Sequence, residues 1–350
     1  MMNYGENSVK DQPLPIGKVD PRILLEKVFK YLGYSREEVI YGPSIGGDAA
    51  VVRLNNVFVV FKTDPIVGAS KNIGKLAINV VSNDIACLGA EPIAATLTIL
   101  LPEGSSESVI EEIMKDAHET AKRLKISIVG GHTEVAMGLK NRPPIVIASA
   151  IGIPVANDPI LPTGVKPGDK IVMTKTAATE GTSILASEFE DELKEALGSE
   201  IVDRAKSFSE RTSIIREALI LAKNRLTHGM HDPTDGGLLE GLYEFSEATS
   251  LGFVVWESKI PIAKETYEIA KYFKIDPLKL ISSGTLLAAV PENKVKQAIK
   301  LLNREGIEAT VIGEFVKDRK IKLLVRKNGA KELINEPVID ELWKIFKLKL

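Results

Sequence analysis

The stretch of residues 72–92, NIGKLAINVVSNDIACLGAEP, most constrains the fold, because it predicts a helix with a charge on its apolar side. Apolar residues recur there at steps of three and four, the spacing of one helix face. Asp84 follows Val80 by four residues and therefore lies on that apolar stripe. A carboxylate that faces a core requires a cation, hydrogen-bond donors or a raised pKa. The helix is expected to end at Gly89, where a left-handed backbone conformation is available without strain.

Two interpretations of Asp84 are open from this stretch alone. It is either a buried residue that caps a neighbouring loop or a functional carboxylate. Asn79 and Asn83 are four residues apart and share a neighbouring face of the same helix. Cys87 falls on or near the apolar stripe, one turn after Asp84, and is expected to be a small core residue and not a nucleophile.

Length and composition narrow the class of protein. A chain of 350 residues is expected to form two domains. A formal net charge of −2 provides no positive electrostatic field that would attract nucleic acid, and no basic stripe that would bind a membrane surface. A single cysteine excludes an internal disulfide framework and a multi-cysteine zinc site. No signal peptide or membrane span is recognisable, so the cytoplasm is the expected compartment, and the scarcity of glutamine favours a thermophile.

The order of predicted elements indicates two domains of mixed α and β structure. Residues 1–19 are expected to be a flexible arm, and residues 20–155 to form the first domain. Prolines and glycines cluster around residues 156–169, which are expected to be a linker. Residues 170–330 are then the second domain, and residues 331–350 a C-terminal tail or helix.

Alternating apolar runs and capping signals predict the individual elements. In the first half we expect helices over 21–32 and 105–124, and strands over 57–62, 93–101, 126–129 and 145–153. In the second half we expect strands over 170–175, 252–256, 284–290, 308–312 and 321–325, and helices over 263–273 and 291–303.

Five acidic residues stand at the ends of predicted elements beside glycine or threonine: Asp48, Asp64, Asp84, Asp232 and Asp235. Such carboxylates suit Mg²⁺, which takes oxygen ligands from one or two carboxylates together with substrate phosphates. Each aspartate alone is equally well explained as a turn or cap residue. The five together favour a metal and phosphate site.

Two histidines and two lysines accompany these carboxylates. His132 and His231 lie in the glycine-bearing loops, where a hydrogen-bonded structural role competes with proton transfer or phosphate contact. Lys62 and Lys75 can meet phosphates or remain solvated. The usual P-loop, dinucleotide-binding and protein-kinase motifs are absent from the sequence, so the common nucleotide-binding folds are not indicated.

Five motifs in a fixed order resemble a known superfamily. They are GGDAAVV (46–52), KTDPIV (62–67), IGKLAINVVSNDIACLGAEP (73–92), VGGHTEV (129–135) and MHDPTDGGL (230–238). The chain resembles the superfamily of aminoimidazole ribonucleotide (AIR) synthetase, hydrogenase-maturation protein HypE, thiamine-monophosphate kinase and selenophosphate synthetase over roughly residues 20–330. The motifs in 73–92 and 230–238 look most like HypE.

The resemblance implies an α/β N-terminal domain, with a mixed sheet that dimerises into a barrel-like layer, and an α+β C-terminal domain. ATP and Mg²⁺ would lie in the cleft between them, with Asp48, Asp64 and Asp84 as metal carboxylates of the first domain and Asp232 and Asp235 from the second. The nucleotide would contact Lys62, Asn83, Gly130, Gly131, His132 and Thr133, and His231 would be catalytic. Such an enzyme uses ATP to phosphorylate an oxygen of its substrate.

Three positions depart from the family pattern. HypE carries its substrate group on a C-terminal cysteine, whereas the only cysteine here is Cys87, so a free small-molecule substrate is expected. Gly47 stands where thiamine-monophosphate kinase has a second aspartate, and His132 stands where many relatives have a carboxylate.

Three functions are therefore open. The first is a HypE-like enzyme that uses ATP and Mg²⁺ to activate an oxygen of a small molecule. The second is a phosphotransferase of the thiamine-monophosphate-kinase type, which Asp235 beside Asp232 favours. The third is a nucleotide-binding maturation or assembly protein without turnover, which Gly47 and His132 favour. The expected partners are a second copy of the chain, a small-molecule substrate and a maturation protein, with no nucleic acid and no membrane.

Overall fold

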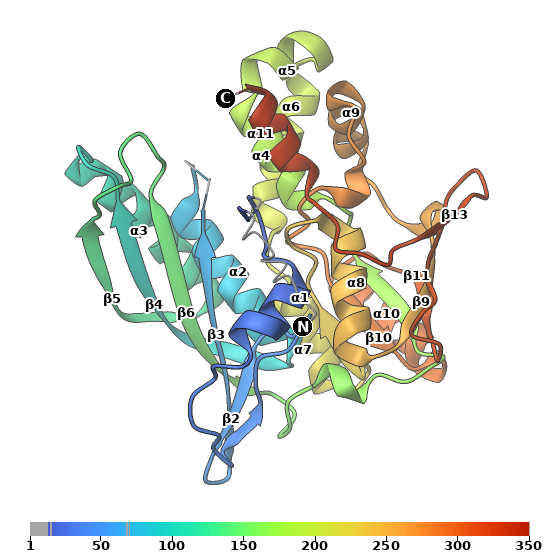
Figure 1. Cartoon of the computed structure of the whole chain (residues 1–350). Coiled ribbons are helices and arrows are strands. Elements are labelled where there is room, and N and C mark those ends of the chain that lie inside the picture. The colour runs from blue at the N-terminus through green and yellow to red at the C-terminus, as the bar shows by residue number, and fades with distance from the viewer. Residues whose placement is uncertain (1–12, 15, 68, 70, 350) are drawn as a thin grey trace, which may run out of the picture.

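The computed structural model contains two β-sheets that lie side by side, each with helices packed on it (Figure 1). It describes residues 13–14, 16–67, 69 and 71–349. Most of the arm expected over residues 1–19 lies outside these described residues. No helix of the described residues is long and apolar enough to cross a membrane.

The first sheet is mixed and has six strands. Their order is β1 (Val39–Tyr41), β2 (Ala50–Leu54), β3 (Val57–Ile66), β6 (Ile145–Pro154), β4 (Ala90–Leu101) and β5 (Ser127–Val135). Neighbouring strands are antiparallel, except that β4 and β5 are parallel. A tight hairpin turn joins β2 and β3, which pair from Leu54 and Val57 onward around a left-handed Asn55.

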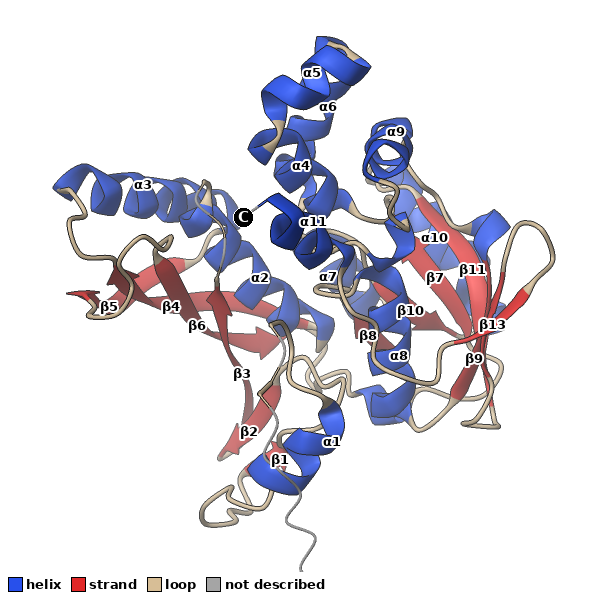
Figure 2. Cartoon of the chain, turned by 45° about the horizontal axis from the view of Figure 1, so that its top comes forward, coloured by secondary structure: helices blue, strands red, loops and turns tan. Residues whose placement is uncertain are grey.

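One face of this sheet is covered and the other is open. Helices α2 (Ile73–Cys87) and α3 (Glu107–Leu124) pack on one face, and no described element covers the opposite face (Figure 2). Phe61 and Ile151 are paired across β3 and β6, and both side chains are exposed on the open face. The helix expected over 21–32 is shorter than predicted: α1 (Pro21–Ile23), capped by Asp20, continues only as a π-helical segment over Leu24–Val28.

The second sheet has seven strands. Their order is β13 (Lys331–Leu333), β12 (Lys322–Val325), β9 (Gly252–Trp256), β11 (Ala309–Val316), β7 (Lys170–Thr174), β10 (Leu287–Val290) and β8 (Gly229–His231). The helices of this half are α4 (Thr179–Glu188), α5 (Glu190–Leu197), α6 (Ser199–Ser207), α7 (Ile215–Lys223), α8 (Gly237–Thr249), α9 (Lys264–Phe273), α10 (Val295–Arg304) and α11 (Glu341–Lys349). Short 3-10 turns span Pro162–Gly164, Phe208–Arg211, Glu257–Lys259, Pro277–Lys279 and Glu292–Lys294.

Helix α2 is buried on all sides. It ends at Leu88 and Gly89, as predicted, and Gly89 has a φ of +69°. The sequence predicted one apolar, buried face of the helix. The buried surface is larger than that, because all fifteen residues of the helix are buried. The reason is that the side away from the first sheet packs against the second domain: Ile85 and Cys87 share one apolar core with Leu221 and Met230. The two domains therefore do not have separate cores at this helix.

Two strands extend further than predicted. Strand β3 was expected to stop before Asp64, but Asp64 pairs with Ala148 inside the sheet. Pro65 is tolerated because β2 pairs with β3 only up to Phe61, so the proline lies on a free strand edge. Strand β5 includes Gly131, which was expected in a loop; a Cβ there would lie 1.9 Å from the Leu97 carbonyl oxygen, so glycine permits the close pairing with β4.

Candidate functional site

A cavity of about 510 Å³ lies between the two domains. Its lining includes, from the first domain and the preceding segment, Ile16–Pro21, Leu24, Ser44–Asp48, Lys62, Asp64 and Asp84. The second domain contributes His231, Asp232, Thr234, Asp235, Glu240 and Glu244, and the C-terminal segment contributes residues 337–340, Trp343, Lys344 and Lys347. All five aspartates predicted as metal ligands therefore border one cavity.

Three of these aspartates are buried. Asp48 precedes β2, Asp84 lies on α2 and Asp232 follows β8, and their exposed fractions are 6%, 4% and 1%. No described residue hydrogen-bonds to Oδ2 of Asp48 or Oδ2 of Asp232. Burial and the nearby charges of Asp84 and Asp48 raise the pKa of Asp232 well above its ordinary value. Buried carboxylates with unpartnered oxygens are unfavourable without a cation, so this donor set fits a divalent metal ion.

Lys62 is the cation nearest to Asp84. Residues 60, 62 and 64 of β3 alternate onto the covered face of the sheet, so Lys62 and Asp64 point towards α2. The Lys62 Nζ lies 2.8 Å from Oδ2 of Asp84 and 3.9 Å from Oδ2 of Asp64. Burial raises the pKa of Asp84 to about 7, against the opposing effect of Lys62 and with further increases from Asp64 and Asp48. The predicted position of the Asp84 carboxyl group on the buried side of the helix is thus confirmed, and Lys62 only partly offsets the effect of burial on its pKa.

His231 lies between two carboxylates. Its Nδ1 is 2.7 Å from Oδ1 of Asp48, and its Nε2 is 3.4 Å from Oε2 of Glu244 on α8. Burial lowers the pKa of His231, but the charges and hydrogen bonds of Asp48 and Glu244 outweigh it and hold the pKa well above its ordinary value. The raised pKa favours the protonated form of the ring. Because both ring nitrogens face carboxylates, the geometry favours a positioning role over proton transfer to a substrate.

The segment before α1 closes one side of the cavity. Lys18 Nζ is 2.9 Å from Oε1 of Glu244, and it donates to Oγ1 of Thr234 at 3.2 Å. Burial lowers the pKa of Lys18, but Glu244, Glu240 and Asp235 raise it overall. Within the arm expected over residues 1–19, Lys18 thus contacts two side chains of the second domain; the flexibility of the arm stays a prediction.

The C-terminal segment closes another side. Asp340 caps α11 by accepting from the Leu342 amide at 2.8 Å, and its other oxygen accepts from the Gly236 amide at 2.6 Å. Trp343 Nε1 donates to Oδ1 of Asp235 at 3.1 Å. Asp235 therefore borders the cavity but is hydrogen-bonded to the C-terminal helix. It does not belong to the group of buried carboxylates at the floor of the cavity.

Asn83 does not line the cavity. Its amide Nδ2 donates to the Thr212 carbonyl at 2.8 Å, and its Oδ1 accepts from the Ile214 amide at 3.0 Å. Both ends of the side chain thus bind the backbone of the second domain, as a clamp between the domains. The neighbouring Asn79 makes one similar bond, from Nδ2 to Oγ1 of Thr212 at 3.2 Å. Nucleotide contact by Asn83 stays a prediction that these contacts do not favour.

The stretch Gly130–Thr133 also lies away from the cavity within a single chain. These residues belong to β5, which among the described strands pairs with β4 alone, and all four are exposed. His132 Nε2 lies 3.2 Å from Oε2 of Glu134 on the same strand. Nucleotide contact by Gly130, Gly131, His132 and Thr133 therefore stays a prediction as well.

Cys87 is fully buried, as predicted, and burial raises the pKa of its thiol well above the ordinary value. It also has a polar neighbour that the sequence did not suggest. The thiol donates a long hydrogen bond to Oδ1 of Asp232, with 3.6 Å between Sγ and the oxygen. One ligand atom each of Asp48, Cys87 and Asp232 lies within 4.8 Å of the others.

Two residues of the site were missed from the sequence. Glu244 lies on the helix that follows Asp235, and its spacing of four from Glu240 indicates that both acids share one face. A Cβ at Gly46 would lie 1.9 Å from the Glu244 carbonyl oxygen, so only glycine fits against this helix. This close approach is a second indication that Glu244 belongs to the site. Lys18 had no signal in the sequence.

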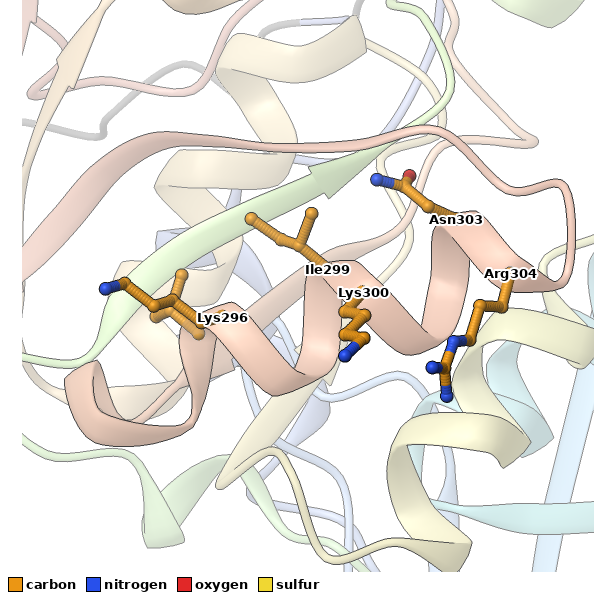
Figure 3. Close-up of a pocket in the computed structure, with 6 residues that line it drawn as sticks. Lys296, Ile299, Lys300, Asn303 and Arg304 are labelled. Atoms are coloured by element: carbon orange, nitrogen blue, oxygen red, sulfur yellow. The ribbon is translucent and has the colours of Figure 1, made fainter.

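A second hollow, of about 590 Å³, lies along α10 and is much more open (Figure 3). A single helix lines it, with Lys296, Lys300 and Arg304 on the surface. It contains no carboxylate and no buried polar group. The buried carboxylates described above therefore line the cavity between the domains and not this hollow.

The curated proteins that resemble this chain include hydrogenase-maturation proteins. A putative hydrogenase expression/formation protein of Methanocaldococcus jannaschii is 27% identical over 343 residues, which cover 94% of this chain and 97% of that protein. The carbamoyl dehydratase HypE of Escherichia coli is 27% identical over 286 residues, which cover 81% of each chain.

Solved structures agree with the fold. A HypE–HypF complex matches with a TM-score of 0.73 at 23% identity, over 90% of this chain and 99% of that chain. HypE in complex with ATP matches with a TM-score of 0.68 at 20% identity, over 93% and 96%. ThiL complexed with AMPPCP and TMP matches with a TM-score of 0.71 at 17% identity, over 92% and 97%.

Two family models match successive parts of the sequence. The model for the AIR synthase related protein, N-terminal domain, matches residues 46–154. The model for the AIR synthase related protein, C-terminal domain, matches residues 166–326. The chain therefore belongs to the AIR synthase-related family, as the order of its motifs indicated.

Proposed function

We propose that the protein is an ATP-dependent enzyme that activates an oxygen atom of a small-molecule substrate by phosphoryl transfer, with Mg²⁺ as the cofactor. The observation that carries this proposal is the set of buried carboxylates Asp48, Asp84 and Asp232 at the floor of the cavity, with Lys62 beside them. The similarity to a HypE–ATP complex and to ThiL with an ATP analogue supports ATP as the nucleotide.

Asp48, Asp64, Asp84 and Asp232 are the residues proposed to hold divalent cations, with Mg²⁺ among them beside the nucleotide phosphates. When bound, Mg²⁺ neutralises phosphate oxygens and the charge that develops during transfer. The unpartnered oxygens of Asp48 and Asp232 and the raised pKa of Asp84 support this assignment, because each of these features disappears when a cation shares the cluster.

The remaining polar residues of the site have proposed roles in positioning. Lys62 holds Asp84 and presents its ammonium group to the cavity, where a transferred phosphoryl group would need a positive charge. His231 fixes one oxygen of Asp48 and leaves the other towards the cluster. Since Asp48 and His231 come from different domains, the closed arrangement of the domains is required for the site.

The substrate of the reaction is proposed to be a free small molecule. The only cysteine of the sequence, Cys87, is fully buried, so it cannot carry a substrate group in the cavity. The similarity to HypE supports a maturation role with a protein partner of the kind found in the HypE–HypF complex.

A homodimer is proposed through the open face of the first sheet. Phe61, Ile151 and Ile153 are exposed there, with fractions of 45%, 37% and 43%. A sheet face with several exposed apolar side chains and no covering element in the described residues is typical of an interface. The exposed strand β5 borders the same sheet, so a second copy would also change the surroundings of Gly130–Thr133.

The experiment that tests the proposed reaction measures ATP consumption by the purified protein with Mg²⁺, first alone and then with candidate acceptors including thiamine monophosphate. Turnover that appears with an acceptor and disappears in Asp84→Asn supports the proposal. Phosphorylation of thiamine monophosphate would identify the kinase-type reaction instead. Tight binding of ATP without turnover under all conditions would indicate a nucleotide-binding assembly protein.

A further inference from the structure

The thiol of Cys87 is part of the carboxylate cluster and not only of the apolar core. Its Sγ lies 3.6 Å from Oδ1 of Asp232, and one ligand atom from each of Cys87, Asp48 and Asp232 lies within 4.8 Å of the others. The three residues come from α2, from the loop before β2 and from the end of β8. Three separate parts of the fold thus place one sulfur and two carboxylates around a common point.

We propose that Cys87, Asp48 and Asp232 together bind one divalent transition-metal cation of the Zn²⁺, Co²⁺ or Fe²⁺ class. This inference rests on the proposed function, from which it takes the cation-binding role of Asp48 and Asp232, and it names the class of ion at that position. Mg²⁺, which avoids sulfur, then accompanies the nucleotide phosphates on the side of Asp64 and Asp84.

The distances suit such an ion. Bonds of about 2.3 Å to sulfur and about 2.1 Å to a carboxylate oxygen, at a tetrahedral angle, place the two ligand atoms about 3.6 Å apart. The distance from Sγ to Oδ1 of Asp232 has this value. A thiol is a weak hydrogen-bond donor, and 3.6 Å is long for its bond to oxygen, so the contact alone compensates the Asp232 charge poorly.

The unpartnered oxygens give an independent reason for an ion. Oδ2 of Asp48 and Oδ2 of Asp232 receive no hydrogen bond from a described residue, and both side chains are more than nine-tenths buried. Lys62 pairs with Asp84 at 2.8 Å, and among the described residues it forms no ion pair with Asp48 or Asp232. His231 accounts for only one oxygen of Asp48.

Binding would change the protonation of the thiol. The S–H bond of Cys87 breaks, the thiolate electron pair forms the bond to the metal ion, and the proton is released to solvent. Asp48 and Asp232 border the cavity, whereas Cys87 does not, so the ion enters from the cavity side. Three protein ligands leave a further coordination position, which faces the cavity and can take a water or a substrate oxygen.

Titration of the metal-free, nucleotide-free protein with Co²⁺ tests this inference. The expected result is a near-ultraviolet sulfur-to-cobalt charge-transfer band that saturates with one ion and is abolished in Cys87→Ser, which replaces the soft sulfur with a hard oxygen of similar shape. In this variant the Kd for Co²⁺ is expected to rise roughly tenfold or more, and the Kd for Mg²⁺ to change much less. Cadmium NMR of the wild-type protein provides a second readout that needs no variant, because a sulfur ligand shifts the cadmium resonance strongly.

The outcomes separate this inference from the proposed reaction. Cobalt binding without a sulfur band, together with Mg²⁺-dependent ATP turnover, overturns the role of Cys87 and leaves the proposed reaction standing. Equal changes of Co²⁺ and Mg²⁺ affinity in Cys87→Ser also overturn it, since Cys87 would then act only through packing. A sulfur band in a protein that never consumes ATP supports the metal site and counts against the reaction.

Discussion

The imidazole Nδ1 of His231, in the second domain, lies 2.7 Å from Oδ1 of Asp48, in the first. The contact joins the two halves of the chain at the floor of the cavity, and Glu244 approaches the ring from its other side. An imidazolium in this place compensates the buried Asp48 and the partly buried Glu244 at once. His231 therefore affects both the stability of the folded protein and the position of Asp48, which is proposed to bind a metal ion.

Replacement of His231 by alanine should reduce stability strongly. It leaves Asp48 buried without its partner, whereas Glu244 keeps its ion pair with Lys18, and removal of one partner from a buried ion pair costs about 3–5 kcal/mol. Denaturant unfolding of the metal-free protein measures this loss. His228→Ala is the matched control, since His228 pairs with Asp169 at 2.8 Å away from the cavity and is partly exposed. A smaller loss in His231→Ala than in His228→Ala would contradict the positioning role.

Asp84→Asn should reduce Mg²⁺-dependent ATP turnover by roughly 10- to 100-fold or more, because a carboxylate ligand at the cation cluster is lost. Circular dichroism is expected to show a folded protein. Asp235→Asn is the comparison, since the amide oxygen of asparagine can still accept from Trp343 Nε1. Its turnover should remain near that of the wild type. A larger effect at Asp235 than at Asp84 would favour the kinase-type assignment of the second aspartate.

The stability of the metal-free protein should depend on Asp84 between about pH 4 and pH 7. Burial raises the pKa of Asp84 to about 7 in the folded protein, from an ordinary value of 3.8. The protonated, folded form is thus favoured at low pH, and its contribution to stability is lost as the pH rises through the folded pKa. Asp84→Asn removes this titration, so the difference in Tm between variant and wild type should grow in favour of the variant towards pH 8.

Divalent cations should reverse this trend in the wild type. Because the carboxylates bind the ion in their charged form, Mg²⁺ should raise the Tm more at pH 8 than at pH 5. Thermal unfolding at both pH values, with and without the ion, measures the effect. An equal rise at both pH values would show that the buried carboxylates are not the ligands.

Asn83→Ala should destabilise the contact between the domains. It removes two buried hydrogen bonds and leaves the Thr212 carbonyl and the Ile214 amide without partners, which costs about 2–4 kcal/mol. Asn79→Ala serves as a matched control, because Asn79 makes one bond to Thr212 and its Oδ1 has none. Denaturant unfolding should show the larger loss for Asn83→Ala. An equal loss would mean that the clamp adds nothing beyond packing.

Charges on the open sheet face should dissociate the proposed homodimer. Phe61→Lys and Ile151→Lys place ammonium groups on adjacent strands of that face, where burial against a second copy would be unfavourable. Light scattering after size-exclusion chromatography should show a monomer for these variants. Tyr267→Lys, at an exposed position of α9, is the control and should leave the molar mass of the wild type unchanged. A wild-type monomer would remove the proposal altogether.

Local patterns in the sequence were sufficient for much of the fold. The periodicity of 73–87 and the glycine at 89 predicted α2 and its end, and the apolar run of 252–256 predicted β9 with its observed bounds. The position of Asp84 on the apolar stripe correctly indicated a buried carboxylate. These features depend on residues close together in the chain, which is where spacing is informative.

The partners of these residues could not be predicted in the same way. Asn83 sits beside Asp84 in the sequence but points to the second domain, because α2 is surrounded on all sides. The bonds of Lys18 and Glu244 depend on how segments more than 200 residues apart meet. Gly130–Thr133 resembled a loop because paired glycines favour turns, yet close pairing with β4 keeps them in a strand.

The complete burial of α2 has a consequence for how the chain can be divided. A cut between residues 154 and 170 would separate the two sheets, but the first fragment would retain a helix of which one side had lost its apolar neighbours, including Leu221 and Met230. Each fragment alone is then expected to aggregate, whereas the two produced together should reassemble around this helix. Helix α2, which carries Asp84, would then provide the surface through which the two fragments bind each other.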